Sequence, residues 1–93
     1  MRVRLTSRAY RDLTNIATHI EADNPTAAQR VMQRIDHSLS LLSAMPQIGR
    51  PSGRPGTREL PVGRFPLLIV YRVGADAIEV LTIFHTSRNP DEK

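Results

Sequence analysis

A chain of 93 residues with a net charge of +4 has room for one domain, and its core must be aliphatic because only two tyrosines and two phenylalanines are present. It has no cysteine, which excludes disulfides and thiolate metal sites. No apolar run reaches the length of a signal-peptide core or a membrane span, so we expect a cytoplasmic protein that does not bind membranes.

The first half of the chain predicts a short strand and two helices. Residues 2–5 alternate charged and apolar side chains, which is typical of a half-buried strand. Thr6 or Ser7 can cap a helix over about residues 7–22, where apolar residues recur at intervals of three and four. Asn24 can cap a second helix over residues 25–44. Because the connection is so short, the two helices should form an antiparallel hairpin.

The second half predicts a loop and a small sheet. Residues 46–56 hold three prolines and three glycines, which favours a loop. Residues 57–88 form three short β-rich runs bounded by Gly, Pro and Asp, which predict an antiparallel meander. We expect an α+β domain over residues 1–93 with the order β-α-α-β-β-β, a helical hairpin on one face of a small antiparallel sheet, and a frayed tail over residues 89–93. The place of the first strand in the sheet stays open.

Arginines gather in the predicted sheet. Of the thirteen basic residues, Lys93 is the only lysine. A GC-rich genome favours arginine codons, but planar guanidinium groups also suit the recognition of phosphate or carboxylate. The residues expected to bind a target or partner are Arg58, Arg64, Tyr71, Arg72, His85 and Arg88. A small sheet with so many cations should bind a polyanion or an acidic protein.

Several short motifs follow one another along the chain. They are Ala9-x-x-Asp12-Leu13-x-x-Ile16, Asn24-Pro25-x-Ala27-Ala28, Pro46-x-Ile48-Gly49-Arg50, Thr57-Arg58-Glu59-Leu60, Val70-Tyr71-Arg72-Val73 and Ile83-x-His85-x-x-Arg88. In this order and spacing they resemble the RelE/ParE superfamily, the toxin half of bacterial type II toxin–antitoxin modules, over about residues 3–90. The resemblance implies the fold of these toxins and a hetero-oligomer with a cognate antitoxin, a small acidic protein with a DNA-binding N-terminal part.

The two branches of this superfamily act on different targets. RelE-like members cut messenger RNA in the ribosomal A site, whereas ParE-like members inhibit DNA gyrase. In a nuclease, His85 could transfer protons, Glu59 could be an alternative base, and Arg58, Arg64 and Arg88 could hold the phosphate. The nuclease branch typically has a lysine-rich surface and often a tyrosine near its C-terminus, which this chain lacks. The pattern His85-x-x-Arg88 is more similar to ParE and its plasmid-stabilisation relatives.

We therefore expect a ParE-like gyrase inhibitor that is neutralised by its antitoxin, rather than an enzyme. The alternatives are a RelE-like endoribonuclease and a degenerate toxin that only binds its antitoxin and operator. Two of the proposed site residues can instead have structural roles. His85 can be a hydrogen-bonded histidine at a strand end, and Glu59 can pair across strands. His19 and His37 should lie at the surface, and two histidines without a third ligand do not indicate a metal site. The sequence has no cofactor motif.

Overall fold

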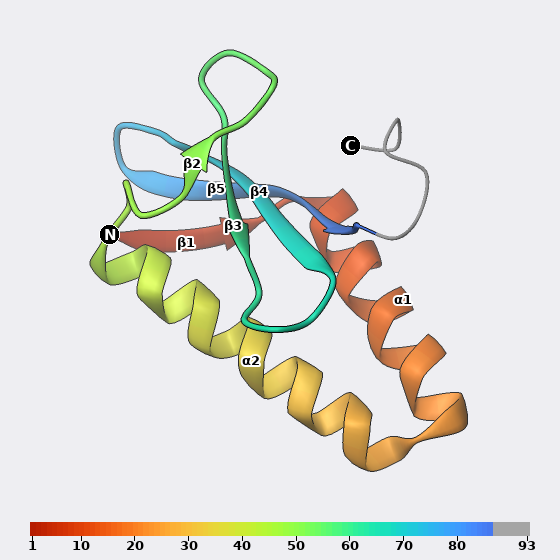
Figure 1. Cartoon of the computed structure of the whole chain (residues 1–93). Helices are drawn as coiled ribbons and strands as arrows, with labels where there is room; N and C mark the ends of the chain where they lie inside the picture. Colours follow the sequence, from red (N-terminus) through yellow and green to blue (C-terminus); the bar gives the residue numbers. More distant parts are fainter. Residues whose placement is uncertain (87–93) are drawn as a thin grey trace.

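The computed structural model describes residues 1–86 and shows the predicted order of elements with one addition (Figure 1). The elements are β1 (Arg2–Leu5), α1 (Ser7–Asp23), α2 (Pro25–Ala44), β2 (Arg50–Pro51), β3 (Arg58–Pro61), β4 (Leu67–Val73) and β5 (Ala77–His85). The addition is β2, a two-residue strand within the segment that was predicted to be a loop. The predicted frayed tail lies outside the described residues.

Capping residues set the ends of both helices where the sequence predicts them. The side chain of Thr6 caps α1 by accepting a hydrogen bond from the backbone N–H of Ala9 at 3.1 Å. The side chain of Asn24 caps α2 by accepting from Ala27 N–H, also at 3.1 Å, and Pro25 occupies the first turn, where its missing N–H is not needed. Within residues 1–86, neither helix is long and apolar enough to cross a membrane.

The sheet has the strand order β1-β5-β4-β3-β2. The three pairs from β2 to β5 are antiparallel, which confirms the predicted meander of β3, β4 and β5. The first strand joins at the edge, parallel to β5, with Arg2 beside Ala77 and Leu5 beside Val80. Between β4 and β5 the register shifts, so that Leu81 is the extra residue of a β-bulge.

Both helices cover the same face of the sheet. Side chains alternate along β4, so that Leu67, Ile69 and Tyr71 point into a core that also contains Val31 and Ile35 of α2. We call the opposite side the open face. Its strand residues, taken from the registers, are Arg2, Arg4, Arg50, Glu59, Pro61, Leu68, Val70, Arg72, Ala77, Glu79, Thr82 and Phe84.

Candidate functional site

A buried tyrosine holds the segment that leads into β2. Tyr71 is fully buried, and its hydroxyl donates to the carbonyl of Pro46 at 2.9 Å and accepts from the N–H of Gly49 at 2.8 Å. Arg58 Nη1 donates to the Gly49 carbonyl at 2.7 Å. A Cβ atom at position 49 would lie 2.6 Å from the Tyr71 hydroxyl and 2.9 Å from the Glu59 carbonyl, so only glycine fits there. We call these contacts the Tyr71 anchor.

Tyr71 and Arg58, two of the residues expected from the sequence to bind a target or partner, both belong to the Tyr71 anchor. Tyr71 has no exposed surface, so it supports a binding surface only indirectly, by fixing the chain around Gly49. Arg58 is half-buried and already donates to a backbone carbonyl. The sequence does not show either interaction, because it does not reveal that the loop before β2 passes over the end of β4.

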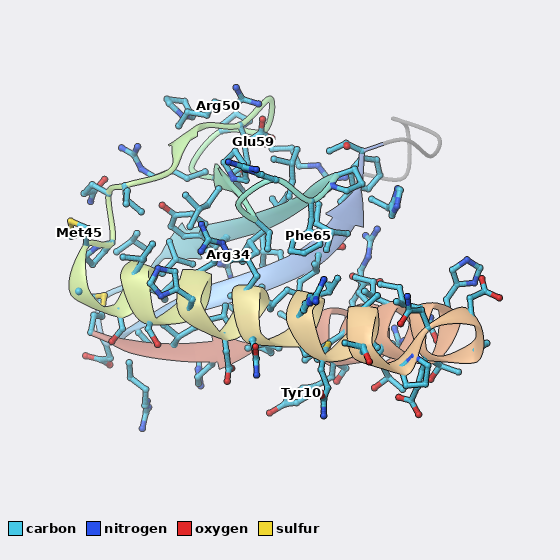
Figure 2. All side chains as sticks on the ribbon, turned by 60° about the horizontal axis from the view of Figure 1, so that its bottom comes forward. Tyr10, Arg34, Met45, Arg50, Glu59 and Phe65 are labelled. Atoms are coloured by element: carbon cyan, nitrogen blue, oxygen red, sulfur yellow. The ribbon has the colours of Figure 1, made fainter. Side chains whose placement is uncertain are left out.

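Glu59 is buried on the open face beside an arginine of β2. Its side chain lies opposite Arg50 in the β2–β3 pair, and Arg50 Nε donates to Glu59 Oε1 at 3.2 Å. Only 6% of Glu59 is exposed. Figure 2 shows this pair on the side of the sheet that faces away from α2. The sequence places Arg50 in a loop and therefore misses this pairing.

A second set of ion pairs crosses three strands of the open face. Arg72 Nη2 lies 2.6 Å from Glu79 Oε1, and Arg72 Nε donates to the same oxygen at 2.9 Å. From the other side, Arg4 Nη2 lies 3.9 Å from Glu79 Oε2. Arg72 was expected to contact a partner, but Arg4 was not recognised, because its place next to β5 does not follow from the sequence.

A groove of about 160 Å³ lies between α1 and the last residues of β5. We call it the α1–β5 groove, and it contains His85, one of the residues proposed from the sequence. Its lining residues are Arg8, Asp12, Asn15, Ile16, His19, Ile20, Val31, Phe65, Pro66, Leu67, Thr82, Ile83, Phe84 and His85. α1 supplies both polar and apolar residues to its lining, and most of the other lining residues are apolar.

Asp12 joins α1 to the free edge of β5 in this groove. β1 ends at Leu5 beside Val80, and within residues 1–86 no strand lies on that side of β5 beyond this point. Asp12 Oδ2 accepts hydrogen bonds from Thr82 Oγ1 at 2.5 Å and from the N–H of Ile83 at 3.1 Å. The Asp12 carboxylate thus takes the place of a strand neighbour, which is why a helix residue bonds to the sheet here.

The comparisons with known proteins decide the family. A family model described as the ParE toxin of the type II toxin–antitoxin system, parDE, matches residues 3–90. The chain belongs to the ParE toxin family. A protein of Sinorhizobium fredii (strain NBRC 101917 / NGR234) named "Putative toxin Y4kP" is 43% identical over 84 residues, which cover 90% of this chain and 86% of that protein.

Solved structures confirm the fold of this ParE-family toxin. The chromosomal ParDE toxin–antitoxin system of P. aeruginosa contains a chain that is 32% identical, with a TM-score of 0.82 over 91% of this chain and 95% of the other. The toxin–antitoxin complex RelBE2 of Mycobacterium tuberculosis contains one that is 25% identical, with a TM-score of 0.63 over 90% and 95%. The predicted RelE/ParE fold and the ParE-like toxin assignment are therefore confirmed.

In this ParE-family toxin the groups proposed for a nuclease lie apart. Glu59 is opposite Val70 and faces the open side, whereas His85 is opposite Leu67 and faces the helices. Arg58 begins β3, and Arg64 lies in the turn that follows the end of this strand, so the two arginines do not form one cluster. Arg88, which was also expected to hold the phosphate, lies outside the described residues. Within residues 1–86, no group of three or more His, Asp or Glu side chains could hold a metal ion.

Proposed function

We propose that this ParE-family toxin inhibits DNA gyrase in the cytoplasm. The observation that carries the choice against RNA cleavage is the placement of Glu59 and His85 on opposite faces of the sheet. A general base and a general acid must each come within about 3 Å of the reacting groups, so Glu59 and His85 cannot act together at one phosphate, and either residue would have to act without the other. The higher TM-score with the ParDE structure, 0.82 against 0.63 for RelBE2, supports the same choice.

The first prediction compares the two targets directly. The purified toxin should abolish negative supercoiling by DNA gyrase and should cut no transcript on translating ribosomes, which is measured by plasmid topology gels and by primer extension. The His85→Ala variant provides the test of the alternative, because loss of a proton-transfer group lowers a cleavage rate by about 10²–10⁴-fold. Codon-specific cuts in the ribosomal A site that disappear in His85→Ala would contradict gyrase inhibition and assign the RelE-like activity to this toxin.

We also propose that the α1–β5 groove receives a segment of a co-encoded acidic antitoxin. Ile16 and Ile20 are only half-buried there, and a partner could cover them together with the half-buried ring of Phe65. An amphipathic helix presents apolar side chains at the spacing that such a groove accepts, and its acidic face suits a toxin with a net charge of +4.

The second prediction places a bulky side chain in this groove. Asn15 is exposed at the rim of the groove, so Asn15→Trp should weaken antitoxin binding at least tenfold, or about 1.4 kcal/mol, in isothermal titration calorimetry. Thr18→Trp is the matched control, since Thr18 is exposed on α1 but does not line the groove. The unmodified toxin should gain about 4 kcal/mol of apparent stability at a thousandfold excess of antitoxin over the Kd. Equal antitoxin affinities for the two tryptophan variants would contradict this binding site.

A further inference from the structure

The net positive charge of the described chain lies entirely in the sheet and its loops. The two helices are neutral, because their cations Arg8, Arg11, Arg30 and Arg34 are matched by Asp12, Glu21, Asp23 and Asp36. The strands and loops of residues 1–86 carry a surplus of four. Their cations are Arg2, Arg4, Arg50, Arg54, Arg58, Arg64 and Arg72, and their anions are Glu59, Asp76 and Glu79. The net charge is therefore unequally divided between the two layers of the molecule, with a neutral helical layer and a positive sheet layer.

Half of this surplus lies on the open face, where four arginines stand against Glu59 and Glu79. Six strand residues of the described chain are exposed, and they are the arginines Arg2, Arg4, Arg50 and Arg72 and the prolines Pro51 and Pro61. All four arginines belong to the open face. A surface of this composition offers guanidinium groups and almost no apolar anchor, which the centre of a protein–protein interface usually requires.

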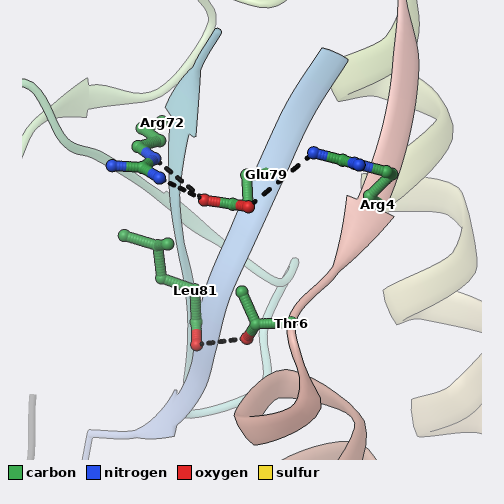
Figure 3. A network of polar contacts seen from close by, with 5 residues as sticks. All are labelled: Arg4, Thr6, Arg72, Glu79 and Leu81. Atoms are coloured by element: carbon green, nitrogen blue, oxygen red, sulfur yellow. Dashed lines mark hydrogen bonds and ion pairs between the residues drawn. The ribbon is translucent and has the colours of Figure 1, made fainter.

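The guanidinium groups of Arg4 and Arg72 lie on either side of one carboxylate. Glu79 lies between them on β5 and pairs with both, as Figure 3 shows. The side chains of Arg4 and Arg72 are nevertheless each 60% exposed, compared with 26% for Glu79. Since neighbouring strands are about 4.8 Å apart, the two arginine backbones lie about 10 Å from each other across the sheet. Arg72, which has two close contacts with Glu79, loses less conformational entropy when it binds than a side chain without such contacts.

The open face also lacks the features that recognise single strands. Proteins bind single-stranded nucleic acid by stacking bases on exposed aromatic rings. The aromatic residues of the described strands are Tyr71, which is fully buried, and Phe84, which is 5% exposed. Contacts to the phosphates of a duplex need only cations, and they supply most of the sequence-independent affinity for DNA.

We propose that the open face over β1, β5 and β4 binds the backbone phosphates of duplex DNA through Arg2, Arg4 and Arg72. Glu79 pairs with two of these arginines and offsets part of their charge, which keeps the affinity of the unmodified toxin for DNA moderate. This contact carries no base specificity, because phosphates are the same at every sequence. It goes beyond the proposed action on gyrase and does not depend on it.

The experiment measures binding of a short fluorescein-labelled DNA duplex by anisotropy at several salt concentrations, from about 50 to 200 mM. The double variant Arg4→Ala/Arg72→Ala is compared with Arg11→Ala/Arg30→Ala, which removes the same charge from exposed positions of the helices. Each lost phosphate contact lowers the slope of log K against log salt by about 0.9, so the sheet variant should lose roughly two units of slope. The helix variant should keep the slope of the unmodified toxin.

An equal decrease of the salt slope in both double variants would show that only net charge attracts DNA and would contradict the proposed site. The Glu79→Gln variant tests the same proposal should Arg4→Ala/Arg72→Ala fail to fold, and it is expected to bind the duplex more tightly because the competing carboxylate is gone. Unchanged or weaker binding by Glu79→Gln would contradict the proposal. Binding of poly-glutamate without binding of DNA would assign the face to an acidic protein, and equal affinity for single-stranded RNA would reject a duplex ligand.

Discussion

Replacing Gly49 by alanine should destabilise the toxin by about 3–4 kcal/mol, because it both overpacks the Tyr71 anchor and breaks its hydrogen bonds. The new Cβ atom would lie 2.6 Å from the Tyr71 hydroxyl, 2.7 Å from Tyr71 Cε1 and 2.9 Å from the Glu59 carbonyl. Neither Tyr71, which is fully buried, nor the backbone of β3 can move away without disturbing the core. The free energy of unfolding is measured by urea denaturation.

Gly53 provides the matched control for this substitution. A Cβ atom there has no neighbour within 4 Å, and its backbone does not have a positive φ, so Gly53→Ala should change stability by at most about 1 kcal/mol. Tyr71→Phe removes the hydroxyl and leaves the Pro46 carbonyl and the Gly49 N–H without this partner, which should cost about 2 kcal/mol. Gly49→Ala and Tyr71→Phe should not be additive, because they disturb one set of contacts. A Gly49→Ala variant as stable as Gly53→Ala would show that the anchor is not needed.

The parts of the fold that were predicted correctly depend on local signals. Thr6 and Asn24 cap the helices at the expected positions because capping involves residues only three apart. The antiparallel meander follows from Gly- and Pro-bounded runs, which are also local. The place of β1 could not be predicted, because its pairing with β5 joins residues about 75 positions apart in the sequence. β2 was missed because two residues, Arg50 and Pro51, are too few to show an alternating pattern.

The candidate site was harder to predict because one extra residue changes which side chains share a face. Val80 faces the helices, and strict alternation from there would place His85 on the open face together with Glu59. The bulge at Leu81 shifts the alternation, so that Ile83 and His85 point towards the helices instead. The sequence lists the same chemical groups in both cases. Only the register separates a possible acid–base pair from two unrelated residues.

Replacing Asp12 by alanine should cost about 3 kcal/mol of stability, because one carboxylate oxygen accepts two hydrogen bonds from β5 and bonds to charged groups are the stronger kind. The loss should lower the Tm by roughly 12–24 °C in a domain of this size. It should also speed hydrogen exchange at the Ile83 amide, since among residues 1–86 no strand lies at that point on the side of β5 opposite β4 to replace the carboxylate.

Two further variants separate the role of Asp12 from a general effect of charge. Asp12→Asn keeps an oxygen that can accept from Thr82 and Ile83 but loses the charge, so its cost should be about half that of Asp12→Ala. Asp36→Ala removes an exposed carboxylate from α2 and should change stability by no more than about 0.5 kcal/mol. If Asp12→Ala has the same Tm as Asp36→Ala and the Ile83 amide stays protected from exchange, then α1 is held to the sheet by apolar packing alone. We expect Asp12→Ala to be the least stable of the three variants, Asp36→Ala the most stable and Asp12→Asn intermediate. This order of stability requires that the carboxylate itself completes the edge of β5.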